Sequence, residues 1–181
     1  MFIKRFIVAI VFVAGALFAS TGTANAAPLE HGFGEDSWFD EFDCNGLITL
    51  QSAGSEQWHY LLNQRGPNGL MYDQVNVSGT NTFTNPDTGK TFTATWRGLG
   101  KELKVTDNGD GTVTIRVISA GPVKYYGPDG QRMFIDTGYF EAERVYDYVN
   151  DVEISWTFVR SVGRFDTAGR DFCMDMAEFL G

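Results

Sequence analysis

Residues 82–96 read TFTNPDTGKTFTATW and contain two short extended segments separated by a turn. In the turn, Pro86 presets the backbone φ angle and Gly89 can adopt a positive φ. In the second segment, residues 91–96, apolar residues alternate with threonines, which is the period-two pattern of a half-buried strand. The stretch therefore predicts a β-hairpin.

The rest of the chain repeats this pattern of strands and turns. Further strands are predicted over residues 46–51, 57–63, 70–77, 103–106, 112–118, 123–126, 131–141 and 152–160, with turns at Gly54, DNGDG, GPDG and Asn150-Asp151. Roughly eight to ten short strands without βαβ units predict an all-β antiparallel meander, forming either a barrel (lipocalin-like) or a sandwich. Phe172, Met176 and Phe179 recur at helical spacing, which predicts a short C-terminal helix over residues 171–180.

Residues 1–26 have the features of a secretory signal peptide. Lys4 and Arg5 precede the apolar run FIVAIVFVAGALFA, and ANA at residues 24–26 supplies a cleavage site. The run is shorter than the roughly 20 residues that a spanning helix needs. We therefore expect a secreted, extracellular protein with no membrane span after cleavage. Behind the signal peptide we expect an irregular acidic and aromatic segment over residues 27–45, then a single all-β domain over residues 46–181.

Cys44 and Cys173 are the only cysteines. Export places them in an oxidising compartment, so we expect a disulfide that ties the start of the domain to its end; two unpaired buried thiols are the alternative. There is no C-x-x-C pair, and no redox role is expected.

The formal charge is −9, and it becomes −11 without residues 1–26, which contain two basic residues and no acid. This charge opposes phosphate backbones, so no nucleic-acid partner is expected. An acidic surface of this kind helps solubility and could attract cationic partners or ions.

Two motifs that suggest chemistry are better explained as ordinary turns and strands. Residues 107–112, DNGDGT, resemble the start of a calcium loop, but the twelfth position is Ile118, so we expect a hairpin turn. Asp136-Thr137-Gly138 copies the tripeptide of aspartic proteases, yet a single copy cannot build a paired-carboxylate site unless two chains dimerise. His31 and His59 show no zinc-binding spacing. No metal or cofactor is expected.

Glu141 and Glu143 lie two residues apart, so both side chains point to the same face of a strand. Such a pair could serve as acid and base in glycoside hydrolysis, with His59 or Asp136 assisting. The alternative is a solvated strand face on which the carboxylates keep an edge soluble.

The aromatic residues are the more informative feature. Trp58, Tyr60, Trp96, Tyr139 and Trp156 all fall on predicted strands. In a closed sheet, inward-facing aromatics could line a cavity for an apolar or ring-bearing ligand. The alternative is that they fill the core.

Three segments resemble known proteins. The signal peptide, the hairpin NPDTGKTFTATW at residues 85–96 and the tail GRFDTAGRDFCMDMAEFLG at residues 163–181 resemble small secreted proteins of Gram-positive actinobacteria. Those proteins are uncharacterised, so the resemblance implies secretion but no activity and no site. Size, meander and terminal helix are also similar to lipocalin-like β-barrels, whose first-strand G-x-W motif is missing before Trp38.

Two main functions follow as hypotheses, beside a structural role in which a stable exported domain adheres to the cell wall or to a neighbouring protein. The first is a secreted, non-catalytic binding or interaction domain for a small apolar ligand or for a cell-surface or protein partner. The second is a secreted hydrolase that uses the carboxylate pair Glu141 and Glu143. They differ in what they require, because an enzyme needs these carboxylates in a cleft with at least one raised pKa.

Overall fold

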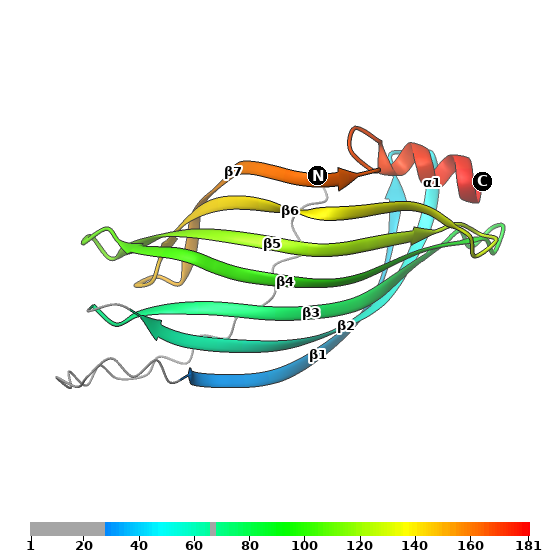
Figure 1. Cartoon of the computed structure of the whole chain (residues 1–181). Helices are drawn as coiled ribbons and strands as arrows, with labels where there is room; N and C mark the ends of the chain where they lie inside the picture. The colour runs from blue at the N-terminus through cyan, green and yellow to red at the C-terminus, as the bar shows by residue number, and fades with distance from the viewer. Residues whose placement is uncertain (1–27, 66–67) are drawn as a thin grey trace.

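The computed structural model describes residues 28–65 and 68–181, and the predicted signal peptide lies outside them. A single antiparallel sheet contains seven strands in the order of the chain, which confirms the meander (Figure 1). The strands are β1 (Pro28–Cys44), β2 (Ile48–Arg65), β3 (Leu70–Thr84), β4 (Thr91–Asp107), β5 (Thr112–Tyr126), β6 (Arg132–Asp147) and β7 (Val152–Phe165), followed by the helix α1 (Phe172–Leu180). The expected eight to ten short strands are fewer and longer in the structure, because β2, β3, β4 and β5 each contain two of them.

Two predictions for the N-terminal part are wrong. The segment over residues 27–45 is not irregular, because residues 28–44 form β1, a strand of 17 residues paired along its length with β2. Gly54 is not a turn; it lies within β2, which merges the two strands expected there. Glycine at this position is explained by Trp38, whose indole covers it: a Cβ on Gly54 would lie 2.3 Å from the ring.

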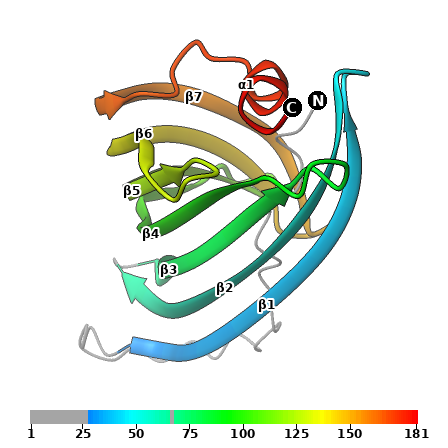
Figure 2. The same ribbon diagram turned by 90° about the vertical axis from the view of Figure 1, so that its right-hand side faces the viewer.

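The sheet is strongly curved but is not closed into a barrel, so β1 and β7 remain its two edges (Figure 2). A band of glycines from five strands crosses it: Gly34, Gly98, Gly121, Gly138 and Gly163. Gly121 and Gly163 have φ angles of +142° and +131°, which L side chains rarely adopt. Backbones approach closely here, since a Cβ on Gly121 would lie 2.2 Å from the carbonyl oxygen of Arg97. Glycines of this kind allow strands to bend sharply.

The register assigns every strand side chain to a face, because residues directly opposite each other in an antiparallel sheet point the same way. We call the face around which the sheet curves, and on which α1 lies, the concave face (Figure 2). Leu50 of β2 and Phe92 of β4 belong to it, and they contact α1 through the core cluster that includes Met176 and Leu180. The opposite face is called the convex face.

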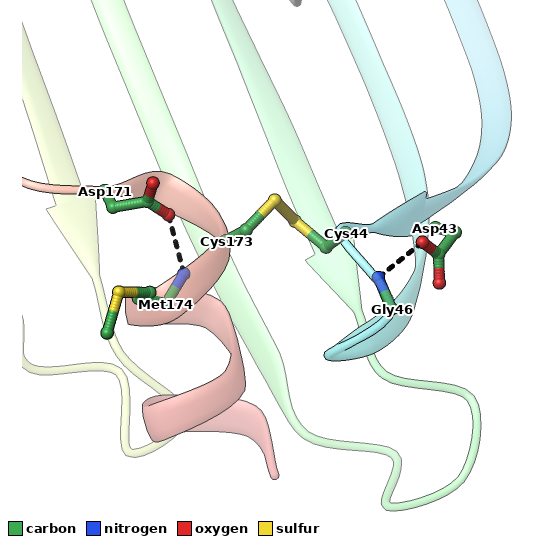
Figure 3. The surroundings of a disulfide bond; sticks show 6 residues. All are labelled: Asp43, Cys44, Gly46, Asp171, Cys173 and Met174. Atoms are coloured by element: carbon green, nitrogen blue, oxygen red, sulfur yellow. Dashed lines mark hydrogen bonds between the residues drawn. A yellow bond between two sulfur atoms is a disulfide. The ribbon is translucent and has the colours of Figure 1, made fainter.

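Helix α1 is joined to the sheet by covalent and polar contacts. The expected disulfide between Cys44 and Cys173 is present and links the end of β1 to the first turn of α1 (Figure 3). Asp171 is the N-cap, and its carboxylate accepts a hydrogen bond from the backbone N–H of Met174 at 2.9 Å.

At its other end α1 is held by the turn between β3 and β4. The side-chain amide of Asn85 donates to the carbonyl of Leu180 at 2.9 Å, and the hydroxyl of Thr88 donates to the same oxygen at 2.7 Å. The turn therefore satisfies backbone acceptors that the end of a helix leaves open. The helix prediction is confirmed, and the core lies between α1 and this end of the concave face.

Candidate functional site

All four tryptophans of the chain lie on the concave face. Leu50 and Trp58 are separated by an even number of residues in β2, so both point to the concave face. Trp58 lies opposite Gly34 of β1 and Val77 of β3, and Trp96 of β4 lies opposite Gly79 of β3, which is two residues from Val77 and therefore on the same face. The same register places Trp38 on β1 and Trp156 on β7 on this face. Strands far apart in the sequence thus present their largest aromatic rings to one side of the sheet.

Several of these rings lie flat over cross-strand glycines. A Cβ on Gly79 would be 2.4 Å from the indole of Trp96, and the glycines under Trp58 and Tyr60 are equally covered. The indoles of Trp38 and Trp96 are stacked, with centroids 6.2 Å apart and planes inclined by 23°. An aromatic ring that covers a glycine packs one flat side on the strand beneath it, which stabilises the strand pairing. Its other flat side points away from that strand.

A hollow of about 710 Å³ lies beside this aromatic surface. Three consecutive residues from each of β1, β2 and β3 line it, together with Trp96 of β4. The middle residues of the three triplets are Asp36, Glu56 and Gly79, which form one cross-strand row on the concave face. Trp96 is a concave residue whose indole covers Gly79, so we assign the hollow to the concave face, over that row.

Polar contacts orient the rings around the hollow. The indole N–H of Trp38 donates to Asn81 at 3.2 Å, and the hydroxyl of the buried Ser52 donates to the same amide oxygen at 3.1 Å. Burial raises the pKa of Glu56, as does the nearby Asp36, while a hydrogen bond from Trp96 acts in the opposite direction. The indoles are therefore held by hydrogen bonds in addition to ring contacts.

The structure brings together most of the predicted ligand-binding residues. Trp58, Tyr60 and Trp96 lie on the concave face of β2 and β4, and Trp156 lies on the same face at the far edge, with 51% of its surface exposed. Tyr139 is on the convex face instead, where the guanidinium of Arg160 lies 5.8 Å from its ring centroid. In β6 the concave positions are the even-numbered ones, so Phe140 occupies the place expected for Tyr139.

Sequence analysis missed Trp38, which lies beside Trp96. Glycine and aspartate occupy several inward positions of β1 and hide the alternation, which is why the sequence indicates an irregular segment there. The signal that could have identified it is that Gly32, Gly34, Asp36 and Trp38 are two residues apart.

The carboxylates proposed for catalysis lie on the convex face. Glu141 is only 4% exposed and accepts hydrogen bonds from Arg116 and Arg160, each at 2.6 Å. These two arginines lower the pKa of Glu141, which is the opposite of what a general acid requires. Glu143 is exposed on the same strand.

The third residue of that hypothesis, His59, is remote from the pair. It lies on β2, with β3, β4 and β5 between it and β6, and its ring stacks on Phe33 at 4.4 Å. Asp136 points to the concave face and accepts from the backbone N–H of Thr167 at 3.1 Å. It thereby fixes the loop between β7 and α1.

A second acidic group, which sequence analysis did not identify, lies on the concave face of β3 and β4. Glu102 is buried and bonds to Arg144 at 2.8 Å and to the backbone N–H of Asp73 at 2.9 Å. Burial and the adjacent Glu102 raise the pKa of Asp73 to about 6. One oxygen of Asp73 and the Nε of Arg144 are buried without hydrogen-bond partners.

The residues that the structure describes contain no group of three or more His, Cys, Asp or Glu side chains placed to hold a metal ion. The DNGDGT stretch is a hairpin turn in which Asp107 accepts from Gly109 and Asp110 accepts from Thr112. Within the described ranges, no helix has the length and apolar character needed to cross a bilayer.

Comparison with known proteins places the chain in no family: no family model, no curated protein and no solved structure matches it. Function must therefore be argued from the geometry of the concave face.

Proposed function

We propose that this protein is a secreted, non-catalytic binding domain that holds a small, ring-bearing apolar ligand on its concave face. The observation that carries the proposal is the convergence of Trp38, Trp58 and Trp96 on one face of the sheet, where Trp96 lines a hollow of about 710 Å³. Pockets of this size suit a small organic ligand, and flat aromatic surfaces are the usual partners of ligand rings.

Secretion is supported by two features of the chain. The first 26 residues have the three parts of a signal peptide. The disulfide between Cys44 and Cys173 is of the kind that persists in oxidising compartments.

The first test is native mass spectrometry of the mature protein purified from the culture supernatant of its own source. A reproducible added mass supports a retained ligand. The second test uses a neutral fluorescent probe, N-phenyl-1-naphthylamine, titrated into the protein and followed by its emission and by tryptophan quenching. Probe binding is expected to be saturable.

The variants Trp96→Ala and Phe39→Ala test whether the probe binds to the concave or to the convex face. Trp96 borders the hollow, whereas Phe39 is 67% exposed on the convex face of β1. Loss of an aromatic anchor at the centre of a site costs about 2 kcal/mol or more, so Trp96→Ala should weaken probe binding at least about 30-fold. Phe39→Ala should leave binding unchanged. Equal effects of the two variants, or no saturable binding by wild type, would contradict the proposal; near-UV circular dichroism verifies that both variants are folded.

A further inference from the structure

Charged side chains are sorted between the two faces of the sheet. Among the described strand residues that the register places on the concave face, the acids are Glu30, Asp36, Asp40, Glu56, Asp73, Glu102, Asp107, Asp136 and Glu153, and the base is Arg144. The convex face has mixed charge: its bases are Arg65, Arg97, Lys101, Lys104, Arg116, Lys124, Arg132, Arg160 and Arg164, and its acids are Glu35, Glu41, Asp43, Glu141, Glu143 and Asp147. The concave face, which carries the tryptophans, is therefore strongly negative. A concave surface lined by charges of one sign focuses the electric field and attracts ions of the opposite sign.

Two of these carboxylates lie directly opposite each other beside the hollow. Asp36 and Glu56 are register partners on the concave face, and both line the hollow with Trp96. Like charges at directly opposed positions destabilise a sheet. Within the part of the chain that the structure describes, neither carboxylate forms an ion pair with Lys or Arg. Each carboxylate accepts a hydrogen bond, Asp36 from the backbone N–H of Ser37 at 2.8 Å and Glu56 from Trp96, but no cation among the described residues offsets their mutual repulsion.

We propose that the ligand of this site is an organic cation with an apolar or ring-bearing body, whose ammonium group lies between Asp36 and Glu56 while its body lies on the indoles of Trp96 and Trp38. This inference rests on the proposed function and names the chemical class of its ligand. A cation at this position relieves the repulsion between the two carboxylates. It also lies close to an indole, the aromatic ring that attracts cations most strongly.

The test compares three soluble probes that share a benzene ring and differ in charge: benzyltrimethylammonium, benzyl alcohol and benzenesulfonate. Each is titrated into the mature protein by calorimetry at low and high salt. The cation should bind at least about tenfold more tightly than the neutral probe at low salt, because each carboxylate attracts it across a short distance. High salt should reduce that preference. Benzenesulfonate should bind most weakly.

The decisive variant is Asp36→Asn/Glu56→Gln, which keeps the shapes of both side chains. It should fold, since it removes a repulsion, and it should reduce the affinity for the cation to that for benzyl alcohol. The matched control Glu41→Gln/Glu178→Gln removes the same charge from the convex face of β1 and from an exposed position of α1. It should leave the preference for the cation within about twofold of wild type.

The outcomes of these titrations distinguish failure of the charge inference from failure of the proposed function. Equal affinities for the three probes in wild type would overturn the charge inference and leave the proposed function standing. A preference for the cation that survives Asp36→Asn/Glu56→Gln would overturn the assignment to these carboxylates. Failure of all three probes and of N-phenyl-1-naphthylamine would overturn the proposed function together with the inference.

Discussion

Replacing both cysteines by alanine, Cys44→Ala/Cys173→Ala, should remove a large part of the stability of this protein. The disulfide joins residues separated by 129 positions, which spans most of the described chain. In the chain-entropy model, closing a loop of that length restricts the unfolded ensemble by about 5 kcal/mol at 25 °C. We therefore expect the free energy of unfolding to fall by about 4–5 kcal/mol, or the midpoint of thermal unfolding to fall by roughly 10–20 °C.

The folded state should change little in this variant, because α1 retains other contacts. Met176 and Leu180 remain buried against the sheet, and the side chains of Asn85 and Thr88 still bond to the carbonyl of Leu180. The loss of stability therefore arises mainly from the unfolded chain, which becomes more expanded without the disulfide. The dependence of stability on denaturant, the m value, should increase accordingly.

The assay is urea unfolding followed by tryptophan fluorescence and by far-UV circular dichroism, for wild type and variant, with and without a reducing agent. The reducing agent should destabilise wild type and leave the variant unaffected, which serves as the internal control. A loss of less than about 2 kcal/mol with an unchanged m value would refute the entropic argument. A loss of helical signal in the native baseline would show instead that the disulfide is needed to hold α1 in place.

Three further predictions concern the core, the bend of the sheet and the buried acid. Leu50→Ala, at a completely buried position under α1, should lower the free energy of unfolding measured in urea by about 2–5 kcal/mol. The control Leu47→Ala, in the exposed turn before β2, should lower it by less than about 0.5 kcal/mol. Gly121→Ala should lower the free energy of unfolding, measured in urea, by about 2 kcal/mol or more, because Gly121 has a φ of +142° and lies against the carbonyl of Arg97. A variant as stable as wild type would contradict the role given to the glycine band. Asp73, whose pKa is raised to about 6, binds more protons in the folded than in the unfolded state between about pH 4 and 6, so stability should fall as pH rises through that window. Asp73→Asn should flatten this dependence and stabilise the protein at pH 7 by about 1 kcal/mol, and a pH profile identical to that of wild type would count against this reasoning.

Sequence patterns determined the local structure wherever strong turn signals and clean alternation coincide. The hairpins around NPDTGK, DNGDG and GPDG, the antiparallel meander, the terminal helix and the disulfide all follow from residues close in the chain or from cysteine count. Prediction failed over residues 28–44 and at Gly54, where glycine and aspartate occupy inward positions of a strand. Their local preference for turns is overridden by pairing with the neighbouring strand and by the indole of Trp38 over Gly54.

Only the tertiary structure decided which side chains meet. The sequence shows that Trp58, Trp96 and Tyr139 belong to strands, but a shift of one residue in register reverses the face of every side chain. The register placed the two tryptophans beside Trp38 and the carboxylates of Asp36 and Glu56, and it placed Tyr139 and Glu141 on the opposite face among arginines. Curvature was likewise decided by contacts between distant strands, because the glycines that permit the bend come from five of them. The amino-acid sequence thus determined the hairpins, the antiparallel meander and the covalent link, whereas the strand β1 and the proposed binding face arose from cross-strand register and bending, which depend on residues far apart in the chain.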